Sequence, residues 1–254
     1  MRKLLLLTAG LFAGLASVIP HFIKVKRQQH ILAATVRISM TTPNWQQMSE
    51  AIEEALPIPP DEYRTMARAD GNVVAEGLGT LVAQGDETLL VTHDHWSRFD
   101  ETLGTVTFRA ADGLLITEMD LRAFKQHLRY RDGGMMVLAA PEVLVSAVPG
   151  SLRFLSSAAL QNGDSVFLAQ RADNRVMLTE AYVVDQIEKQ GRPAVRLQSA
   201  SGQTVVGGDS GGGVWINGRL AAIMWTRVMM EDLTTGERQV TDLSVAALYD
   251  RKPR

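Results

Sequence analysis

The chain has 254 residues, a formal net charge of -2 and 46% hydrophobic residues, which is enough for one sizeable folded domain and an extension. The near-neutral charge gives no reason to expect nucleic acid as a partner. Because there is no cysteine, disulfides, zinc–cysteine sites and a thiol nucleophile are all excluded. A nucleophilic enzyme of this composition would therefore use another side chain, such as a hydroxyl.

The first 27 residues have the pattern of an export signal or a membrane anchor. A short basic start precedes an uncharged apolar run at residues 4–19, and basic residues follow within 24–27. A helix of a globular protein would show a polar face, and this run has none. We expect an extracytoplasmic protein, periplasmic or secreted, whose first segment is either cleaved or kept as an anchor that associates with the membrane.

Residues 28–66 read as an extension with one helix. Residues 31–40 fit either a first strand or a linking segment. Apolar residues at helical spacing predict a helix over 45–56, which begins after the capping sequence at 41–44 and ends at the prolines of 57–60. We expect this extension to pack on the surface of the domain that follows.

Short strand-like segments separated by turn signals fill residues 67–254 and predict an all-β domain. The segments before Pro141 are 73–82, 88–92, 105–108, 114–116 and 135–138. Those after it are 165–169, 175–178, 181–184, 194–197, 214–216 and 220–225. Asn217-Gly218 predicts a tight hairpin turn, residues 234–237 predict another, and residues 243–249 fit a short closing helix.

A glycine-rich segment, VGGDSGGGVW at residues 206–215, has the composition of a nucleophile turn. Glycines allow a tight turn and a close approach of substrate to the main chain, and a serine nucleophile needs both a base and nearby N–H donors. Taken alone, the segment could be a simple turn between strands. However, an apolar strand upstream ends in THDH at residues 92–95, and an aspartate lies between the two.

These two segments resemble the motifs of trypsin-like (chymotrypsin-fold) serine proteases. GDSGG at 208–212 is similar to the nucleophile motif, and VTHDH at 91–95 is similar to the segment where a strand ends at the catalytic histidine. The order His, Asp, Ser is also that of the family. The resemblance, to disulfide-free bacterial members, implies two six-stranded antiparallel β-barrels at about 67–141 and 142–254, preceded by a helical extension.

The resemblance also implies the catalytic residues. His95, three residues after Thr92, would be the general base, and His93 is its rival because strand alternation puts both on one face. Ser210 would attack the scissile carbonyl, and the backbone N–H groups of Gly208 and Ser210 would form the oxyanion hole. Asp209 would need no freed N-terminal amine, since no activation sequence precedes the barrel strands.

Asp132, before the apolar segment 135–138, is the predicted orienting carboxylate, although glycines at 133–134 depart from the family pattern. Asp100, Asp112 and Asp120 are the other candidates.

The predicted substrate pocket contains four residues: Thr204, Val205, Trp225 and Thr226. It holds no carboxylate, so we expect a neutral P1 residue, small or aliphatic. Asp94 between two histidines has the chemistry of a metal ligand, but three adjacent residues rarely converge on one ion. We predict no metal and no cofactor.

We therefore predict an exported serine endopeptidase that cleaves protein or peptide substrates through a Ser–His–Asp triad and an acyl-enzyme intermediate. The alternative is a catalytically inactive binding or scaffold protein with the protease fold. The complete nucleophile motif favours the enzyme, and the departure at residues 133–134 keeps the alternative open.

Overall fold

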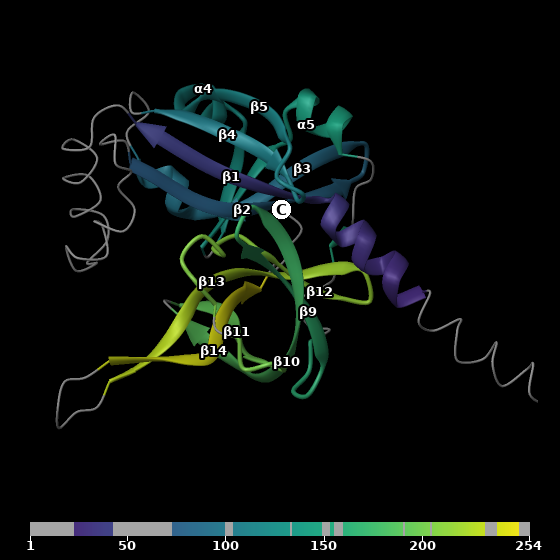
Figure 1. Ribbon diagram of the computed structural model, residues 1–254, viewed down its shortest axis with the longest axis vertical. Coiled ribbons are helices and arrows are strands. Elements are labelled where there is room, and N and C mark those ends of the chain that lie inside the picture. The colour runs from purple at the N-terminus through teal and green to yellow at the C-terminus, as the bar shows by residue number, and fades with distance from the viewer. Residues whose placement is uncertain are drawn as a thin grey trace, which may run out of the picture.

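The structure is a computed structural model that describes residues 23–42, 73–99, 104–132, 134–148, 153–154, 160–189, 191–203, 205–231 and 238–248. Two sheets of seven strands each follow one another along the chain. Figure 1 shows them as two bodies, the first in purple, blue and teal above the second in green and yellow. The all-β, two-barrel fold class predicted from the sequence is confirmed.

The first sheet has the order β5-β4-β1-β2-β3-β7-β6. Its strands are β1 (Thr35–Thr42), β2 (Val73–Gln84), β3 (Glu87–His93), β4 (Thr105–Ala110), β5 (Leu115–Asp120), β6 (Leu128–Asp132) and β7 (Met135–Ala139). Three short helices accompany them: the 3-10 helix η1 (Asp94–Arg98), α4 (Leu121–Gln126) and α5 (Glu142–Ala147). All neighbouring strands are antiparallel. Side chains of the sheet point alternately inward and outward, as in β1, where Val36, Ile38 and Met40 are buried.

Strand β1 belongs to the first sheet, although it lies within the segment that we assigned to the extension. It pairs with both β2 and β4, so the sheet begins at Thr35 and not at the predicted boundary of residue 67. A helix over residues 23–33 leads directly into β1 (Figure 1). The helix predicted over 45–56 lies outside the described residues.

The second sheet closes into a barrel of six strands. The order is β12-β9-β10-β11-β14-β13-β8, and an additional pairing of β12 with β13 completes the ring. The strands are β8 (Arg153–Phe154), β9 (Ser165–Ala172), β10 (Arg175–Lys189), β11 (Arg192–Ser199), β12 (Gly213–Ile216), β13 (Arg219–Glu231) and β14 (Arg238–Leu248). The predicted closing helix at 243–249 is wrong, because residues 243–248 are part of β14, which pairs with both β11 and β13.

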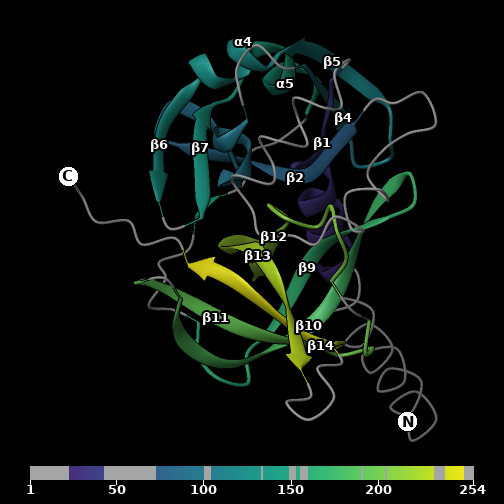
Figure 2. The ribbon, with the colours of Figure 1, turned by 90° about the vertical axis from the view of Figure 1, so that its left-hand side faces the viewer.

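Each barrel has its own apolar interior, and a third cluster joins the two. Met135 and Val137 of β7 pack with Trp215 of β12 and Ile223 of β13, and Ile31 of the N-terminal helix joins them. All five side chains are at most 1% exposed. The barrels are therefore held together by a continuous core, and Figure 2 shows β12 and β13 of the second sheet lying directly below the first sheet.

Candidate active site

Ser210 lies in a tight turn that precedes β12 and is fixed from both barrels. Its carbonyl oxygen accepts the N–H of Leu78 from β2 at 2.8 Å. The next residue, Gly211, donates its N–H to the Met224 carbonyl of β13 at 2.9 Å. Gly211 has a φ of +86°, and a β-carbon there would overlap the Leu78 carbonyl oxygen. Only glycine fits this position, so the turn depends on its sequence.

Asp209 anchors the same turn from inside. Its side chain is fully buried, and its carboxylate accepts the backbone N–H of Arg171 at 2.6 Å and of Val206 at 2.9 Å. Gln170 donates a third, longer hydrogen bond of 3.4 Å. Burial raises the pKa of this carboxyl group, and the two backbone N–H groups act in the opposite direction. Backbone N–H groups therefore take the place of water around the Asp209 carboxylate, and these hydrogen bonds hold the backbone around Ser210.

Gly208 gives the turn its second sharp bend. Its φ is +93°, a conformation that favours glycine, and a β-carbon there would overlap the Arg171 guanidinium. Within the described part of the chain, the N–H groups of Gly208 and Ser210 donate to no protein acceptor.

His95 lies on η1, just beyond the end of β3, and its ring is partly buried. Trp96 packs against it with ring centroids 4.3 Å apart, and Phe99 meets it edge-on at 6.2 Å. Trp96 is fully buried and donates its Nε1–H to the Thr92 hydroxyl at 3.2 Å. Thr92 in turn donates to the Leu78 carbonyl at 2.7 Å, which ties the histidine segment to β2.

The structure brings His95 and the serine turn together next to Gly77 in β2. A β-carbon at Gly77 would lie 2.9 Å from the Ser210 carbonyl oxygen and 3.4 Å from Cε1 of His95. The imidazole and the serine turn therefore share one small residue as a common neighbour. The two segments lie more than 100 positions apart in the sequence, and the junction of the barrels places them side by side.

His93 makes the contact to the Nδ1 atom of His95. The two Nδ1 atoms lie 2.8 Å apart, and the ring centroids are 4.9 Å apart. His93 Nδ1 also accepts the backbone N–H of His95 at 3.0 Å, so that it caps the first turn of η1. The side chain is 8% exposed. The sequence identified His93 only as a rival of His95, and the two histidines in fact lie in contact.

Asp132, the predicted partner of His95, is hydrogen-bonded to Arg192. It ends β6, and its Oδ1 accepts a hydrogen bond from Arg192 Nη1 of β11 at 2.7 Å. No hydrogen bond joins it to either histidine among the residues that the structure describes. The residue directly before β7 is Gly134, whose φ is +93°, and a β-carbon there would lie 3.0 Å from the Trp225 ring. A catalytic role for Asp132 stays a prediction.

Asp94 binds Arg131: its Oδ2 accepts a hydrogen bond from Arg131 Nη2 at 2.6 Å. No three His, Cys, Asp or Glu side chains gather as a metal site would require in the described ranges. Of the other candidates, Asp100 lies outside the described residues. Asp112 caps the β4–β5 turn through the N–H of Leu114 at 3.0 Å, and Asp120 ends β5.

The residues of the predicted substrate pocket are only partly placed. Thr204 lies outside the described residues, and Val205 is buried in the interior of the second barrel. Trp225 and Thr226 are partly exposed on β13, and Lys189 lies over the Trp225 ring at 5.0 Å. The predicted preference for a small or aliphatic P1 residue therefore stays untested.

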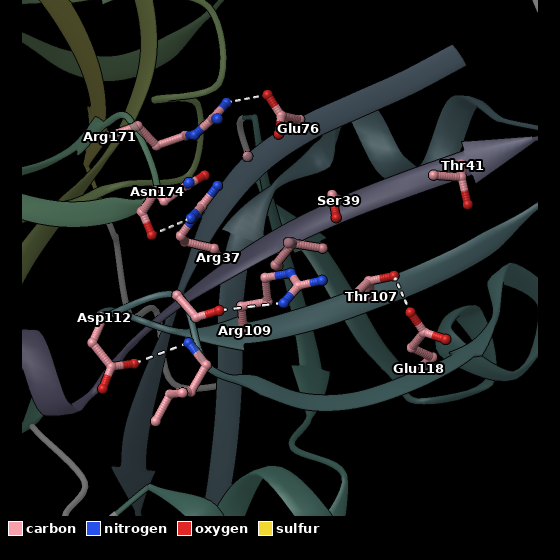
Figure 3. A pocket seen from close by; sticks show the side chains of 14 residues that line it. Arg37, Ser39, Thr41, Glu76, Thr107, Arg109, Asp112, Glu118, Arg171 and Asn174 are labelled. Carbon is pink, nitrogen blue, oxygen red and sulfur yellow. Dashed lines mark hydrogen bonds and ion pairs between the residues drawn. The ribbon is translucent and has the colours of Figure 1, made fainter. Parts of the chain in front are cut away.

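A polar cavity of about 580 Å³, shown in Figure 3, has Gly77 among its lining residues and so borders the site. Arg37, Arg109 and Arg171 converge on it from β1, β4 and β9. Arg171 forms an ion pair with Glu76 across the two barrels, and Arg37 donates to the Asn174 carbonyl. Burial and the charge of Arg171 both lower the pKa of Arg37. Sequence analysis missed this cluster, because its members carry no motif and meet only through strand pairing.

The N-terminal apolar run lies outside the described residues. Within the described residues, none of the helices combines the length and the apolar character needed to cross a membrane.

Neither a family model nor a curated protein matches the sequence. Solved structures do match. A variant of the HtrA-type protease AlgW, determined with a decapeptide, has 13% identity and a TM-score of 0.54 over 88% of this chain and 62% of that chain. AlgW with a tripeptide has 12% identity and a TM-score of 0.53, over 88% of this chain and 59% of that chain.

The Rv3671c protease in an inactive form has 16% identity and a TM-score of 0.52, over 90% of both chains. This chain therefore spans about three fifths of the AlgW chains and most of the Rv3671c chain. At such identities the likeness concerns the fold, which is the chymotrypsin-like two-barrel fold of HtrA-type and trypsin-like serine proteases.

Proposed function

We propose that the protein is a serine endopeptidase in which Ser210 is the nucleophile and His95 the general base. The observation that carries the proposal is the meeting of the two segments at Gly77, where an added β-carbon would lie close to both the serine turn and the imidazole. A nucleophile and its base have to lie within reach of each other, and acyl transfer by a serine needs this pair in a preorganised cleft.

In the proposed reaction the Ser210 hydroxyl proton passes to Nε2 of His95 while Oγ attacks the peptide carbonyl carbon. The negative charge that develops on the carbonyl oxygen is stabilised by the N–H groups of Gly208 and Ser210. The protonated His95 then donates its proton to the leaving amine, which gives an acyl-enzyme that water hydrolyses. The two N–H groups support this role because they donate to no acceptor within the described protein.

Proteins or peptides are the proposed substrates. The AlgW structures that this chain resembles were determined with a tripeptide and a decapeptide. We keep the neutral, small or aliphatic P1 residue as part of the proposal, because the sequence places Thr204 and Val205 and no carboxylate in the predicted pocket.

Export is proposed from the apolar run at residues 4–19 and its basic flanks. The protein would act outside the cytoplasm, either released or attached to the membrane by this segment. We also propose that activity needs no freed N-terminal amine, since two backbone N–H groups already bind the Asp209 carboxylate. N-terminal sequencing of active protein tests both points: a new Ile or Val terminus just before β1 or β2 would contradict the second.

The decisive test is labelling of the full-length protein with a fluorophosphonate probe, which reacts only with an activated serine. We expect one labelled site and its loss in Ser210→Ala. Ser201→Ala is the matched control, since Ser201 is an exposed serine near the same barrel and its variant should keep full labelling. Folded wild-type protein that takes up no label would support a binding or scaffold role in place of the enzyme.

A further inference from the structure

We infer that His93 is the residue that positions the catalytic His95. This inference rests on the proposed function, because it concerns the base of that reaction. It starts from the 2.8 Å contact between the two Nδ1 atoms and from the 3.0 Å hydrogen bond between the backbone N–H of His95 and Nδ1 of His93.

The backbone hydrogen bond fixes the tautomer of His93. An imidazole nitrogen accepts a hydrogen bond only when it carries no proton. Nδ1 of His93 accepts the His95 backbone N–H, so its own proton must be on Nε2. His93 is therefore neutral, and the one lone pair of its Nδ1 is shared between the backbone N–H and the ring nitrogen of His95.

The tautomer of His95 follows from that of His93. Two unprotonated nitrogens 2.8 Å apart would repel each other, so the proton between them belongs to Nδ1 of His95. A neutral histidine with its proton on Nδ1 has its lone pair on Nε2. This is the form that a general base needs, and the second partner of an imidazole commonly sets it.

Strand pairing explains why a carboxylate from β6 does not occupy this place. Asp132 pairs with Met135, and Met135 pairs with His93, so the aspartate stands two strands away from His93 in the same row. Neighbouring strands are about 4.8 Å apart, which puts the two backbones about 10 Å from each other. Gly134, directly before β7, offers no side chain and faces the Trp225 ring.

His93 can position the His95 ring because its own backbone is paired and its own side chain is buried. It is the last residue of β3, pairs with Met135 of β7 and is more than nine-tenths buried. During the reaction the Ser210 proton moves to Nε2 of His95, while the Nδ1 proton of His95 stays where it is and is shared with His93. A neutral partner orients the imidazole but supplies no negative charge for the imidazolium, which a carboxylate would.

The first test measures the tautomer directly in full-length protein with ¹⁵N-labelled histidine, assigned by His95→Gln. We expect the His95 proton on Nδ1 in the wild type and in His93→Asn, because the asparagine Oδ1 is an acceptor close to the position of Nδ1 and a good helix cap. In His93→Leu, which has no acceptor, we expect a mixture of tautomers. An unchanged His95 spectrum in folded His93→Leu would overturn the inference.

The second test measures the rate constant of fluorophosphonate labelling. We expect His93→Leu to label about 10²-fold more slowly, within the range of a general-base contribution, and His93→Asn to label within about tenfold of the wild type. A purely structural role would not be restored by the smaller asparagine. Asp132→Asn is measured beside them: if it lost the labelling rate while His93→Leu kept it, the aspartate would be the positioning residue and the inference would be wrong.

The two tests separate this inference from the proposed function. The tautomer is read without turnover, so a wild type that fails to label would refute the enzyme and leave the histidine contact intact. A wild type that labels, with the His95 proton on Nε2, would refute the histidine contact and leave the enzyme intact.

Discussion

The two halves of the candidate site are built in different ways. The serine half comes from one contiguous segment, residues 206–213, in which Asp209 binds backbone N–H groups and Gly211 is packed against β2. The histidine half combines the ends of β3 and β6, the start of β7 and η1, and there His93 makes the contact predicted for Asp132. The serine segment is packed against backbone atoms and therefore tolerates few substitutions. The histidine half is assembled from several strands, so a side chain from a neighbouring position can make a given contact.

The largest expected effect is on the serine half, in Gly211→Ala. The φ of this residue is +86°, and the added β-carbon would overlap the Leu78 carbonyl oxygen. It would also lie 2.7 Å from Thr92 Oγ1 and 2.8 Å from the backbone nitrogen of His93. We expect a loss of at least about 3 kcal/mol in the free energy of unfolding, measured by urea denaturation. Gly207→Ala is the control: it meets nothing within 4 Å and should stay within about 0.5 kcal/mol. Equal effects of the two would show that the turn is not rigidly packed.

A smaller loss is expected in the histidine half, in Thr92→Val. The Thr92 hydroxyl accepts a hydrogen bond from the Trp96 Nε1–H and donates one to the Leu78 carbonyl. Valine removes both of these buried hydrogen bonds. We expect destabilisation of about 1–3 kcal/mol. Thr92→Ser keeps the hydroxyl and should lose clearly less in the same denaturation experiment. If valine were tolerated as well as serine, the histidine half would be more adaptable than this comparison allows.

The pH dependence of the free energy of unfolding should reveal the contribution of Asp209, the buried aspartate of the serine half. The pKa of Asp209 is raised by burial, so the folded state binds its proton more tightly than the unfolded state does. Its contribution is then fully present below the unfolded pKa of about 3.9 and is lost as the pH rises through the folded value. We expect Asp209→Asn to remove this downward slope from the free energy of unfolding measured at a series of pH values. A slope that persists unchanged in the variant would assign it to other groups.

The smallest effect should come from the ion pair that holds Asp132. Arg192→Ala removes the partner at 2.7 Å, but the arginine and aspartate side chains are 53% and 24% exposed. We expect a stability change below about 1 kcal/mol, and one that shrinks further at high salt. A loss of several kcal/mol, measured by the same denaturation, would mean that this pair is as tightly built as the serine half.

Much of the fold could be read from the sequence, because alternating apolar residues and turn signals are local features. The serine turn, the strand that ends at the histidines and most strands of both barrels were found in this way. Two elements were not. Residues 31–40 fitted a strand or a linker, and residues 243–249 fitted a helix. Pairing with distant strands fixed residues 35–40 as part of β1 and residues 243–248 as part of β14.

The residues of the candidate site also fall into those that a single segment predicts and those that only strand pairing brings together. Ser210, Gly208 and Asp209 stand in one segment, so the resemblance of that segment to a known motif was enough to propose roles for them. The sequence also placed both histidines on one face of the chain, but it could not say which atoms they share. The Arg37–Arg109–Arg171 cluster had no signal at all, since its members come from three strands in two barrels.

By itself, the amino-acid sequence determined the chemistry that is available: a serine between glycines, two histidines at a strand end, and no thiol. Tertiary structure alone decided which groups meet. Strand register carried Asp132 to Arg192 and left His93 beside His95, and the joined cores of the two barrels brought the serine turn against Gly77. The reason is physical: a strand fixes its side chains by local alternation, but its neighbours are chosen by pairing and burial across the whole chain.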